Sequence, residues 1–346
     1  MPENSSSHVN PEKLRKRSPE RSASDLLAGL KQRDVSALSQ AITLVESNLP
    51  AQREKAAELL RDCLPLSGNS IRIGITGIPG AGKSTLIEAL GKSFLEKGHR
   101  LAVLAVDPSS QVSRGSILGD KTRMETLSGH GDVFIRPTPS GGALGGVARA
   151  TREAVVLCEA AGYDIIFIET VGVGQSETTV HSIVDIFLLV AIPGAGDELQ
   201  GIKRGIMEMA DLIVINKAEG ENAEKAKAAA RHLENALHLF PAHRYGHTVE
   251  VMKCSALQQT GIREVYDKLV SLGSFFRNNG MFALRRKEQA LYWLKESIDQ
   301  GLKDMFYTDD KIKQQYELIK KDVEDGTTGP FEAAAALLQL FRSGRA

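Results

Sequence analysis

One run of eight residues constrains the fold more than any other feature of this 346-residue chain. The run consists of Gly77, Ile78, Pro79, Gly80, Ala81, Gly82, Lys83 and Ser84, and Thr85 follows it. It matches the pattern GxxxxGK[ST], and it lies between an apolar stretch, 71–76, and a helix-forming stretch, 84–96. In this context the glycines let backbone N–H groups point at phosphates, the lysine reaches the β- and γ-phosphates, and the serine hydroxyl coordinates Mg²⁺. The sequence therefore predicts a phosphate-binding loop between a strand and a helix.

Beyond this loop, short apolar runs alternate with helical stretches. The predicted strands are 71–76, 101–106, 132–135, 164–168, 186–192, 212–215 and 249–253. The predicted helices between most of them are 84–96, 144–160, 199–209, 223–237 and 262–272. Strands that are apolar throughout are buried on both faces, as in a parallel sheet covered by helices. We therefore expect an α/β fold, a doubly wound and mostly parallel sheet, with helical extensions at both ends of the chain.

The two ends of the chain differ in composition from the middle. Residues 1–23 are rich in Ser, Pro and charged side chains, which predicts a disordered tail. From 24 to 68 the apolar residues recur at helical spacing, which predicts an N-terminal helical extension ahead of a P-loop domain at 69–273. A C-terminal helical region, 274–346, carries apolar stripes that either pack on the parent domain or pair with another subunit.

Composition and charge exclude several classes of partner. Lys plus Arg and Asp plus Glu both number 43, so the net charge is zero and we expect no nucleic-acid or membrane-surface binding. The longest nearly apolar run, 183–192, is too short to cross a bilayer. Cys63, Cys158 and Cys254 are far apart and form no CxxC pair, which predicts a reduced, cytoplasmic protein.

A second motif follows the predicted strand 212–215. Asn216-Lys217-Ala218-Glu219 resembles the NKxD motif with which GTPases recognise guanine, with Glu219 in place of the usual Asp. A carboxylate accepts hydrogen bonds from the guanine N1–H and exocyclic amine, whereas adenine has no donor at N1. Lys217 would lay its aliphatic stem along the base. A partner loop that would donate to guanine O6 follows the last strand and contains Ser255, Ala256 and Leu257.

Two carboxylates are expected beside the phosphates. Asp107 ends the predicted strand 101–106, and Glu169 ends the strand 164–168. Because the carboxyl ends of parallel strands share one edge of a sheet, both lie where Mg²⁺ needs hard oxygen ligands.

With these motifs in chain order, the sequence resembles a known family. The resemblance lies in Val-Asp-Pro-Ser-Ser at 106–110, the stretch 115–124, Glu-Thr-Val-Gly-Val-Gly-Gln-Ser-Glu at 169–177, and 194–205. These segments closely resemble the methylmalonyl-CoA mutase-associated GTPases, known as MeaB, ArgK or the methylmalonic aciduria type A protein. The resemblance extends from about residue 25 to the end of the chain.

The resemblance implies a function and a set of site residues. It implies a GTP-hydrolysing chaperone of an adenosylcobalamin-dependent acyl-CoA mutase, above all methylmalonyl-CoA mutase, which gates cofactor loading and protects or reactivates the mutase. It also implies a homodimer that uses the C-terminal helices. The implied Mg²⁺ ligands are Ser84, Asp107, Asp120 and Glu169, with Asp120 in the first switch. Residues 171–177 resemble the second switch, and a third switch that communicates with the mutase contains Asp197, Gln200 and Lys203.

The segment 171–177 departs from ordinary GTPases in one respect. In Ras-like proteins the water-orienting Gln follows the DxxG glycine directly, but here Val173 does, and Gln175 lies three positions past Gly172. Without a charge-stabilising group in place, we expect slow intrinsic hydrolysis that a partner accelerates. The residues to which we assign catalytic roles are Lys83, Asp107, Asp120, Glu169 and Gln175.

Three other functions are less consistent with these residues. A P-loop kinase of the ArgK type would use ATP, which the motif 216–219 disfavours. A nickel metallochaperone GTPase would need clustered Cys and His ligands, and the eight histidines and three cysteines form no such cluster in the sequence. A pure interaction module with a degenerate nucleotide site is disfavoured by the intact Lys83 and Ser84.

Overall fold

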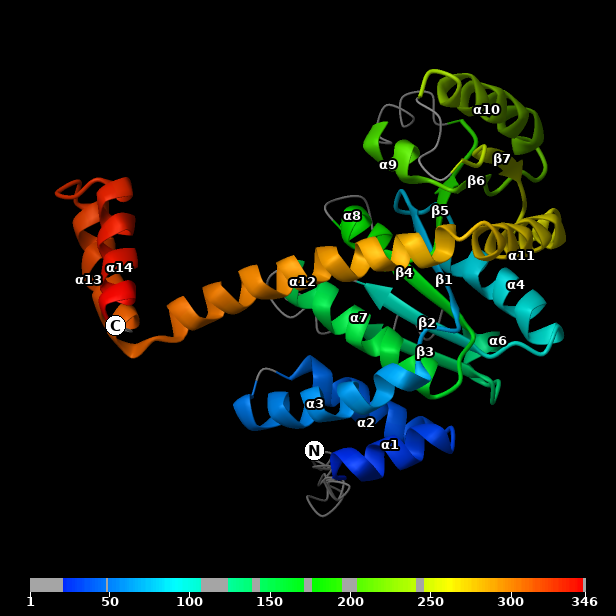
Figure 1. Ribbon diagram of the computed structural model, residues 1–346. Coiled ribbons are helices and arrows are strands. Elements are labelled where there is room, and N and C mark those ends of the chain that lie inside the picture. Colours follow the sequence, from blue (N-terminus) through cyan, green and yellow to red (C-terminus); the bar gives the residue numbers. More distant parts are fainter. Residues whose placement is uncertain are drawn as a thin grey trace, which may run out of the picture.

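The computed structural model describes residues 21–47, 49–106, 124–138, 144–170, 176–194, 204–240 and 246–344. In this part of the chain, a seven-stranded sheet is covered by helices, and one long helix leads away from it (Figure 1).

All seven strands run parallel, in the order β3-β2-β4-β1-β5-β6-β7. The strands are β1 (Ile71–Gly77), β2 (Leu101–Val106), β3 (Val133–Thr138), β4 (Ile165–Thr170), β5 (Ile186–Ala191), β6 (Leu212–Ile215) and β7 (Glu250–Lys253). Each differs from its predicted bounds by at most three residues. The α/β fold predicted from the sequence is therefore confirmed. Because β2 to β4 lie on one side of β1 and β5 to β7 on the other, the carboxyl end of β1 is the position at which such sheets bind ligands.

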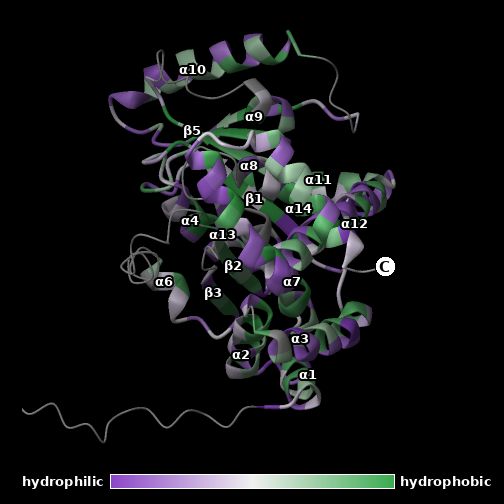
Figure 2. Cartoon of the chain, turned by 90° about the vertical axis from the view of Figure 1, so that its left-hand side faces the viewer, coloured by the Kyte–Doolittle hydropathy of each residue, from purple (hydrophilic) through white to green (hydrophobic). Residues whose placement is uncertain are grey.

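The sheet is buried on both faces because its strands are apolar at every position. Along β2, Leu101 and Val103 join a core with α4 (Lys83–Glu96) and α11 (Ile262–Asn278). The alternate residues Ala102 and Leu104 join a second core with α7 (Leu144–Ala160) and the N-terminal helices. Figure 2 shows the strands coloured hydrophobic between these helices. The other helices of the domain are α6 (Glu125–Ser128), α8 (Ser176–His181), α9 (Arg204–Met209) and α10 (Asn222–Leu237).

The N-terminal extension consists of three helices and a short 3₁₀ turn. They are α1 (Ala23–Lys31), α2 (Val35–Glu46), α3 (Pro50–Cys63) and η2 (Leu64–Leu66). Ser22 begins α1 with a capping box, in which its hydroxyl accepts from the Asp25 N–H and its own N–H donates to Asp25. The helices bury one apolar face, including Leu30 and Ile42, in the core that also contains α7.

The C-terminal region is a helical arm. It contains α12 (Met281–Thr308), α13 (Asp310–Glu324) and α14 (Pro330–Ser343). Figure 1 shows that α12 runs across the α/β domain and beyond it, so that α13 and α14 lie at its far end, away from the sheet. The predicted domain boundary at Ser274 falls inside α11. Among the described residues, no helix is long and apolar enough to cross a membrane.

Buried ion pairs fix the start of α12 to the sheet. The guanidinium nitrogens of Arg285 lie 2.9 Å from both carboxylate oxygens of Asp211, and Asp211 also accepts from the Phe187 N–H at the start of β5. Arg286 donates at 2.8 and 2.7 Å to Asp185, which precedes the same strand. Removing one partner of such a buried pair is costly, because the other charge is left without compensation. The root of the arm is therefore firmly attached to the domain.

Candidate nucleotide-binding site

The predicted phosphate-binding loop joins β1 to α4 at the carboxyl edge of the sheet. Gly77 has a φ of +150°, and a Cβ there would lie 2.2 Å from the Val190 carbonyl oxygen of β5. Gly82 has a φ of +83°, and a Cβ there would lie 2.6 Å from the Asn216 side-chain nitrogen. Both positions therefore require glycine, one for close contact with a neighbouring strand and the other for contact with the motif 216–219.

Lys83 lies under this loop and is only 8% exposed. Its ammonium group donates to the carbonyl oxygens of Gly77 at 2.9 Å and Ile78 at 3.2 Å. Burial lowers the pKa of Lys83, and the nearby carboxylates of Glu169 and Glu177 oppose this effect. Phosphate oxygens would be stronger acceptors for this cation than the two carbonyls it contacts here.

Ser84 and Glu169 lie together beside the loop. The Ser84 hydroxyl donates to Glu169 Oε1 at 3.1 Å, and Glu169 is 6% exposed at the end of β4. The next residue, Thr170, donates to the Thr76 hydroxyl at 2.9 Å and so joins the carboxyl ends of β4 and β1. A hydroxyl and a carboxylate in contact supply two hard oxygen ligands, which suits Mg²⁺. Among the described residues, no group of three or more His, Cys, Asp or Glu side chains lies close enough together to hold a metal.

Asn216 connects three loops of the site. Its side-chain nitrogen donates to the Ala81 carbonyl at 2.9 Å, and its oxygen accepts from the Ala256 N–H at 3.0 Å. The Cys254 thiol lies 3.7 Å from the same oxygen, and burial raises the pKa of Cys254 to about 12, so the thiol stays protonated and can donate. The structure thus brings together the phosphate-binding loop, the motif 216–219 and the loop after β7, which are far apart in sequence.

Glu219 carries the clearest sign of a missing partner. Its Oε2 atom is buried, yet it has no hydrogen-bond partner among the described residues. A buried carboxylate oxygen without a donor is unfavourable, which suggests that a ligand supplies the donor. Lys217, two residues before Glu219, has a φ of +60° and is exposed. In the partner loop, Ser255 and Ala256 are buried. Leu257, by contrast, is 77% exposed.

One group that the sequence did not single out belongs to this site. Glu177 is 1% exposed in the first turn of α8, and its carboxylate acts on the Lys83 ammonium. It lay within the segment 169–177, but nothing in that pattern shows that α8 turns this side chain inward. Six predicted site residues lie outside the described residues: Asp107, Asp120, Gln175, Asp197, Gln200 and Lys203.

Known proteins resemble this chain over most of its length. The family described as "Methylmalonyl Co-A mutase-associated GTPase MeaB" matches residues 38–311. A "Putative GTPase" of Caulobacter vibrioides is 51% identical over 309 residues, which cover 89% of this chain and 94% of the relative. The "GTPase ArgK" of Escherichia coli is 43% identical over 315 residues, with coverage of 91% and 95%.

A eukaryotic relative and a solved structure extend the comparison. The mouse "Methylmalonic aciduria type A homolog, mitochondrial" is 44% identical over 328 residues, which cover 92% of this chain and 79% of the relative. The solved structure, titled "LAO/AO transport system kinase", is 35% identical, covers 92% of this chain and 97% of its own, and superposes with a TM-score of 0.71. The chain is therefore a GTPase and belongs to the methylmalonyl Co-A mutase-associated GTPase family, MeaB.

Proposed function

We propose that this GTPase is a chaperone of an adenosylcobalamin-dependent acyl-CoA mutase, with methylmalonyl-CoA mutase as the first candidate. It would gate cofactor loading and protect or reactivate the mutase. The observation that carries the proposal is the family match over residues 38–311, because the family is named for its association with this mutase. We also propose the cytoplasm as its compartment, where the buried thiols of Cys63, Cys158 and Cys254 would stay reduced.

The partner is tested by retention on the immobilised chain. Cytosol from the source cells would be passed over it with GDP or with a non-hydrolysable GTP analogue, and bound proteins would be identified by mass spectrometry. We expect an acyl-CoA mutase to be retained, to a different extent with the two nucleotides, since GTP hydrolysis can regulate the complex only if the affinities differ. A purified mutase that neither binds nor changes the GTPase rate would contradict the proposal.

For hydrolysis, we assign a role to each residue of the site. Backbone N–H groups of the loop 77–84 and the N-terminus of α4 would hold the phosphates, and Lys83 would exchange its carbonyl acceptors for phosphate oxygens. Ser84 and Glu169 would hold Mg²⁺ together with Asp107 and Asp120. The ion would neutralise charge on the β- and γ-phosphates. Gln175 stays a prediction as the water-orienting residue.

A kinase that uses ATP is the second candidate, because the solved relative is titled a transport system kinase. The described part of the site favours guanine instead. The unpaired oxygen of Glu219 requires a donor, which guanine N1–H supplies and adenine N1 does not.

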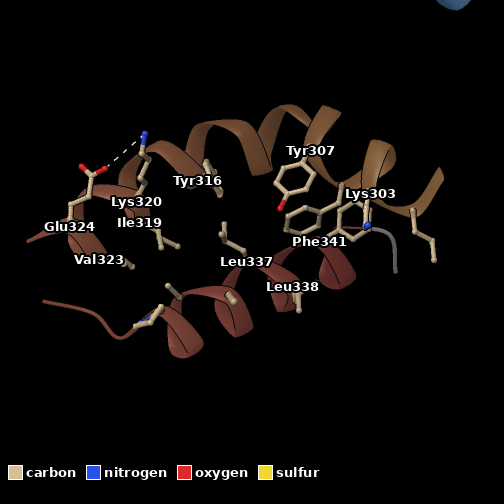
Figure 3. Close-up of a pocket in the computed structure, with 15 residues that line it drawn as sticks. Lys303, Tyr307, Tyr316, Ile319, Lys320, Val323, Glu324, Leu337, Leu338 and Phe341 are labelled. Atoms are coloured by element: carbon tan, nitrogen blue, oxygen red, sulfur yellow. Dashed lines mark ion pairs between the residues drawn. The ribbon is translucent and has the colours of Figure 1, made fainter. Parts of the chain in front are cut away.

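We further propose that the chain forms a homodimer through the arm. Leu291, Leu294 and Ile298 of α12 are 59, 59 and 53% exposed, which is unfavourable for apolar side chains arranged in one stripe. The stripe leads to an apolar groove of about 800 Å³ between the end of α12, α13 and α14. Figure 3 shows Tyr316, Leu337 and other apolar residues lining it from both sides. A second copy of the arm would cover the stripe and the groove together.

Truncation after Gln300 is expected to give a monomer by light scattering. This cut removes the groove but keeps Arg285, Arg286 and Trp293, through which α12 is attached to the α/β domain. A cut at Ser274 would instead divide α11, whose Leu272 and Phe276 are buried.

In the full chain, Ile298→Asp should weaken the dimer, whereas Lys295→Ala, an exposed change on the same helix, should leave it intact. A truncated chain that still dimerises would show that the groove is not needed, and would place the interface on the retained stripe of α12 or on the α/β domain.

A further inference from the structure

The short helix α8 extends from the nucleotide site to the root of the arm. α8 packs against β1, and β1 leads directly into the phosphate-binding loop. In the first turn of α8 lies the buried carboxylate of Glu177, whose charge opposes the effect of burial on the pKa of Lys83. α8 is therefore linked to the phosphate-binding loop by its packing on β1 and by the interaction between the charges of Glu177 and Lys83. When phosphates bind Lys83, the negative charge around this cation increases, and the electrostatic potential at Glu177 changes.

The helix α8 and the loop that follows it pack directly against β1. A Cβ on Gly74 would lie 2.9 Å from Val180 Cγ1 and 3.0 Å from Val184 Cγ2, so these side chains occupy the space of a missing side chain on the strand. Val180 and Val184 are both fully buried. In such close packing a short helix moves as a unit, and a shift at one end is transmitted to the other.

The far end of α8 is held by α12. Gln289 donates to the Val184 carbonyl at 2.7 Å and reaches the His181 carbonyl at 3.5 Å. The indole N–H of Trp293 donates to the Ser182 carbonyl at 3.0 Å. Trp293 is 4% exposed, and the Arg152 guanidinium lies 4.8 Å from its ring centroid.

These contacts differ from those that anchor the arm. Arg285 and Arg286 bind the carboxylates of Asp211 and Asp185, which precede strands of the rigid sheet. Gln289 and Trp293 instead bind backbone carbonyls at the end of α8 and in the loop after it. The ion pairs already fix α12, so the second set of contacts gives α12 a connection to the element that carries Glu177.

We propose that Gln289 and Trp293 are positioning residues for GTP hydrolysis, which act through α8 on Lys83, and that the nucleotide in turn changes their contacts. Coupling between two sites is reciprocal, so an arm that holds α8 in place affects the nucleotide site, and a bound nucleotide affects the root of the arm. The inference rests on GTP hydrolysis by this chain and requires no mutase, so its test is independent of the proposed partner.

Trp293 provides the first test, because it is the only tryptophan in the chain. Trp293 donates to the Ser182 carbonyl, which lies before the start of β5, whereas the phosphate-binding loop follows the end of β1. Ile73 of β1 pairs with Ile186 of β5, so the two positions lie at opposite ends of these parallel strands. About four residues of strand, roughly 13 Å, separate the two ends, so the nucleotide does not touch the indole. We expect tryptophan emission to differ between GDP and a non-hydrolysable GTP analogue. Lys83→Ala should reduce this difference, since the signal passes through Lys83.

The second test separates positioning from stability. Gln289→Met keeps the side-chain length but removes the donor, and Trp293→Phe removes the indole N–H. Loss of a hydrogen bond of this kind should slow single-turnover hydrolysis, measured with the protein in saturating excess over GTP, by about two- to tenfold while GTP affinity changes less. The control is Lys287→Ala, an exposed residue of the same helix turn. Melting temperatures of all three variants would show whether the domain itself is affected.

The outcomes are distinct. Slower single turnover in Gln289→Met at an unchanged melting temperature, together with nucleotide-dependent emission in the wild type, supports the coupling. Identical emission with both nucleotides, or hydrolysis in Gln289→Met and Trp293→Phe as fast as in Lys287→Ala, overturns it. In that case the contacts of Gln289 and Trp293 only attach the arm, and the proposed chaperone function stands or fails separately.

Discussion

Replacing Lys83 with alanine is expected to reduce kcat for GTP hydrolysis by about 10²- to 10³-fold, the usual effect of losing one group that stabilises transition-state charge. Lys83 follows the loop at the start of α4, and its ammonium group lies within hydrogen-bond distance of two loop carbonyls. It is therefore already positioned at the loop that would hold the phosphates, and it needs only to exchange acceptors when GTP binds. The measurement is steady-state hydrolysis at saturating GTP with excess Mg²⁺.

The fold should tolerate this substitution. Burial lowers the pKa of Lys83, which means that the folded state disfavours the charged ammonium and gains little stability from it. We expect circular dichroism to be unchanged and the melting temperature to shift by only a few degrees, roughly what 1 kcal/mol produces. Lys97→Ala, an exposed substitution at the end of α4, is the matched control. Turnover at the wild-type rate in a folded Lys83→Ala variant would remove Lys83 from the mechanism.

The sheet and the phosphate-binding loop could be predicted because their signals are local. A complete eight-residue motif between an apolar strand and a helix leaves few alternatives, and strands apolar at every position require cover on both faces. Along β2, for example, alternate residues enter the two cores, as this pattern requires. Chain order then places Asn216 and Ala256 at the same edge of the sheet as the loop.

The links between the site and the arm could not be predicted, because they depend on tertiary packing. In the sequence, Arg285 and Gln289 are ordinary polar residues of a helix, and nothing there indicates Asp211 or the Val184 carbonyl as their partners. The burial of Glu177 could not be predicted for the same reason, because it follows from the packing of α8 against β1 at Gly74. The apolar stripe on α12 was recognised, but its spacing is the same for a helix that packs on its own domain and one that projects from it.

Glu219 offers the sharpest test of guanine recognition. The carboxylate accepts hydrogen bonds, and its Oε2 atom is buried with no partner in the described part of the chain. Guanine presents donors at N1 and at its exocyclic amine. Hydrogen bonds to a charged group contribute about 1.5 to 3 kcal/mol, so Glu219→Ala should weaken GTP binding by roughly ten- to a hundredfold. ATP binding should change little, because adenine has no donor at N1.

An isosteric change should go further and move the preference to another base. In Glu219→Gln the side chain gains an N–H₂ group at one end, which repels the guanine amine but can donate to the carbonyl that xanthine carries at the same position. We therefore expect the variant to bind xanthosine triphosphate more tightly than GTP, which titration calorimetry would measure.

Glu221→Gln, in the same loop but exposed, is the control and should keep the wild-type preference. The substitution also replaces a buried carboxylate that lacks a donor, so the melting temperature should not fall. A Glu219→Gln variant that still prefers GTP to the wild-type extent would contradict this role of Glu219. The additional methylene of Glu219 would then move its carboxylate away from the base. Asn216 and the Ala256 N–H would have to account for guanine selection without Glu219.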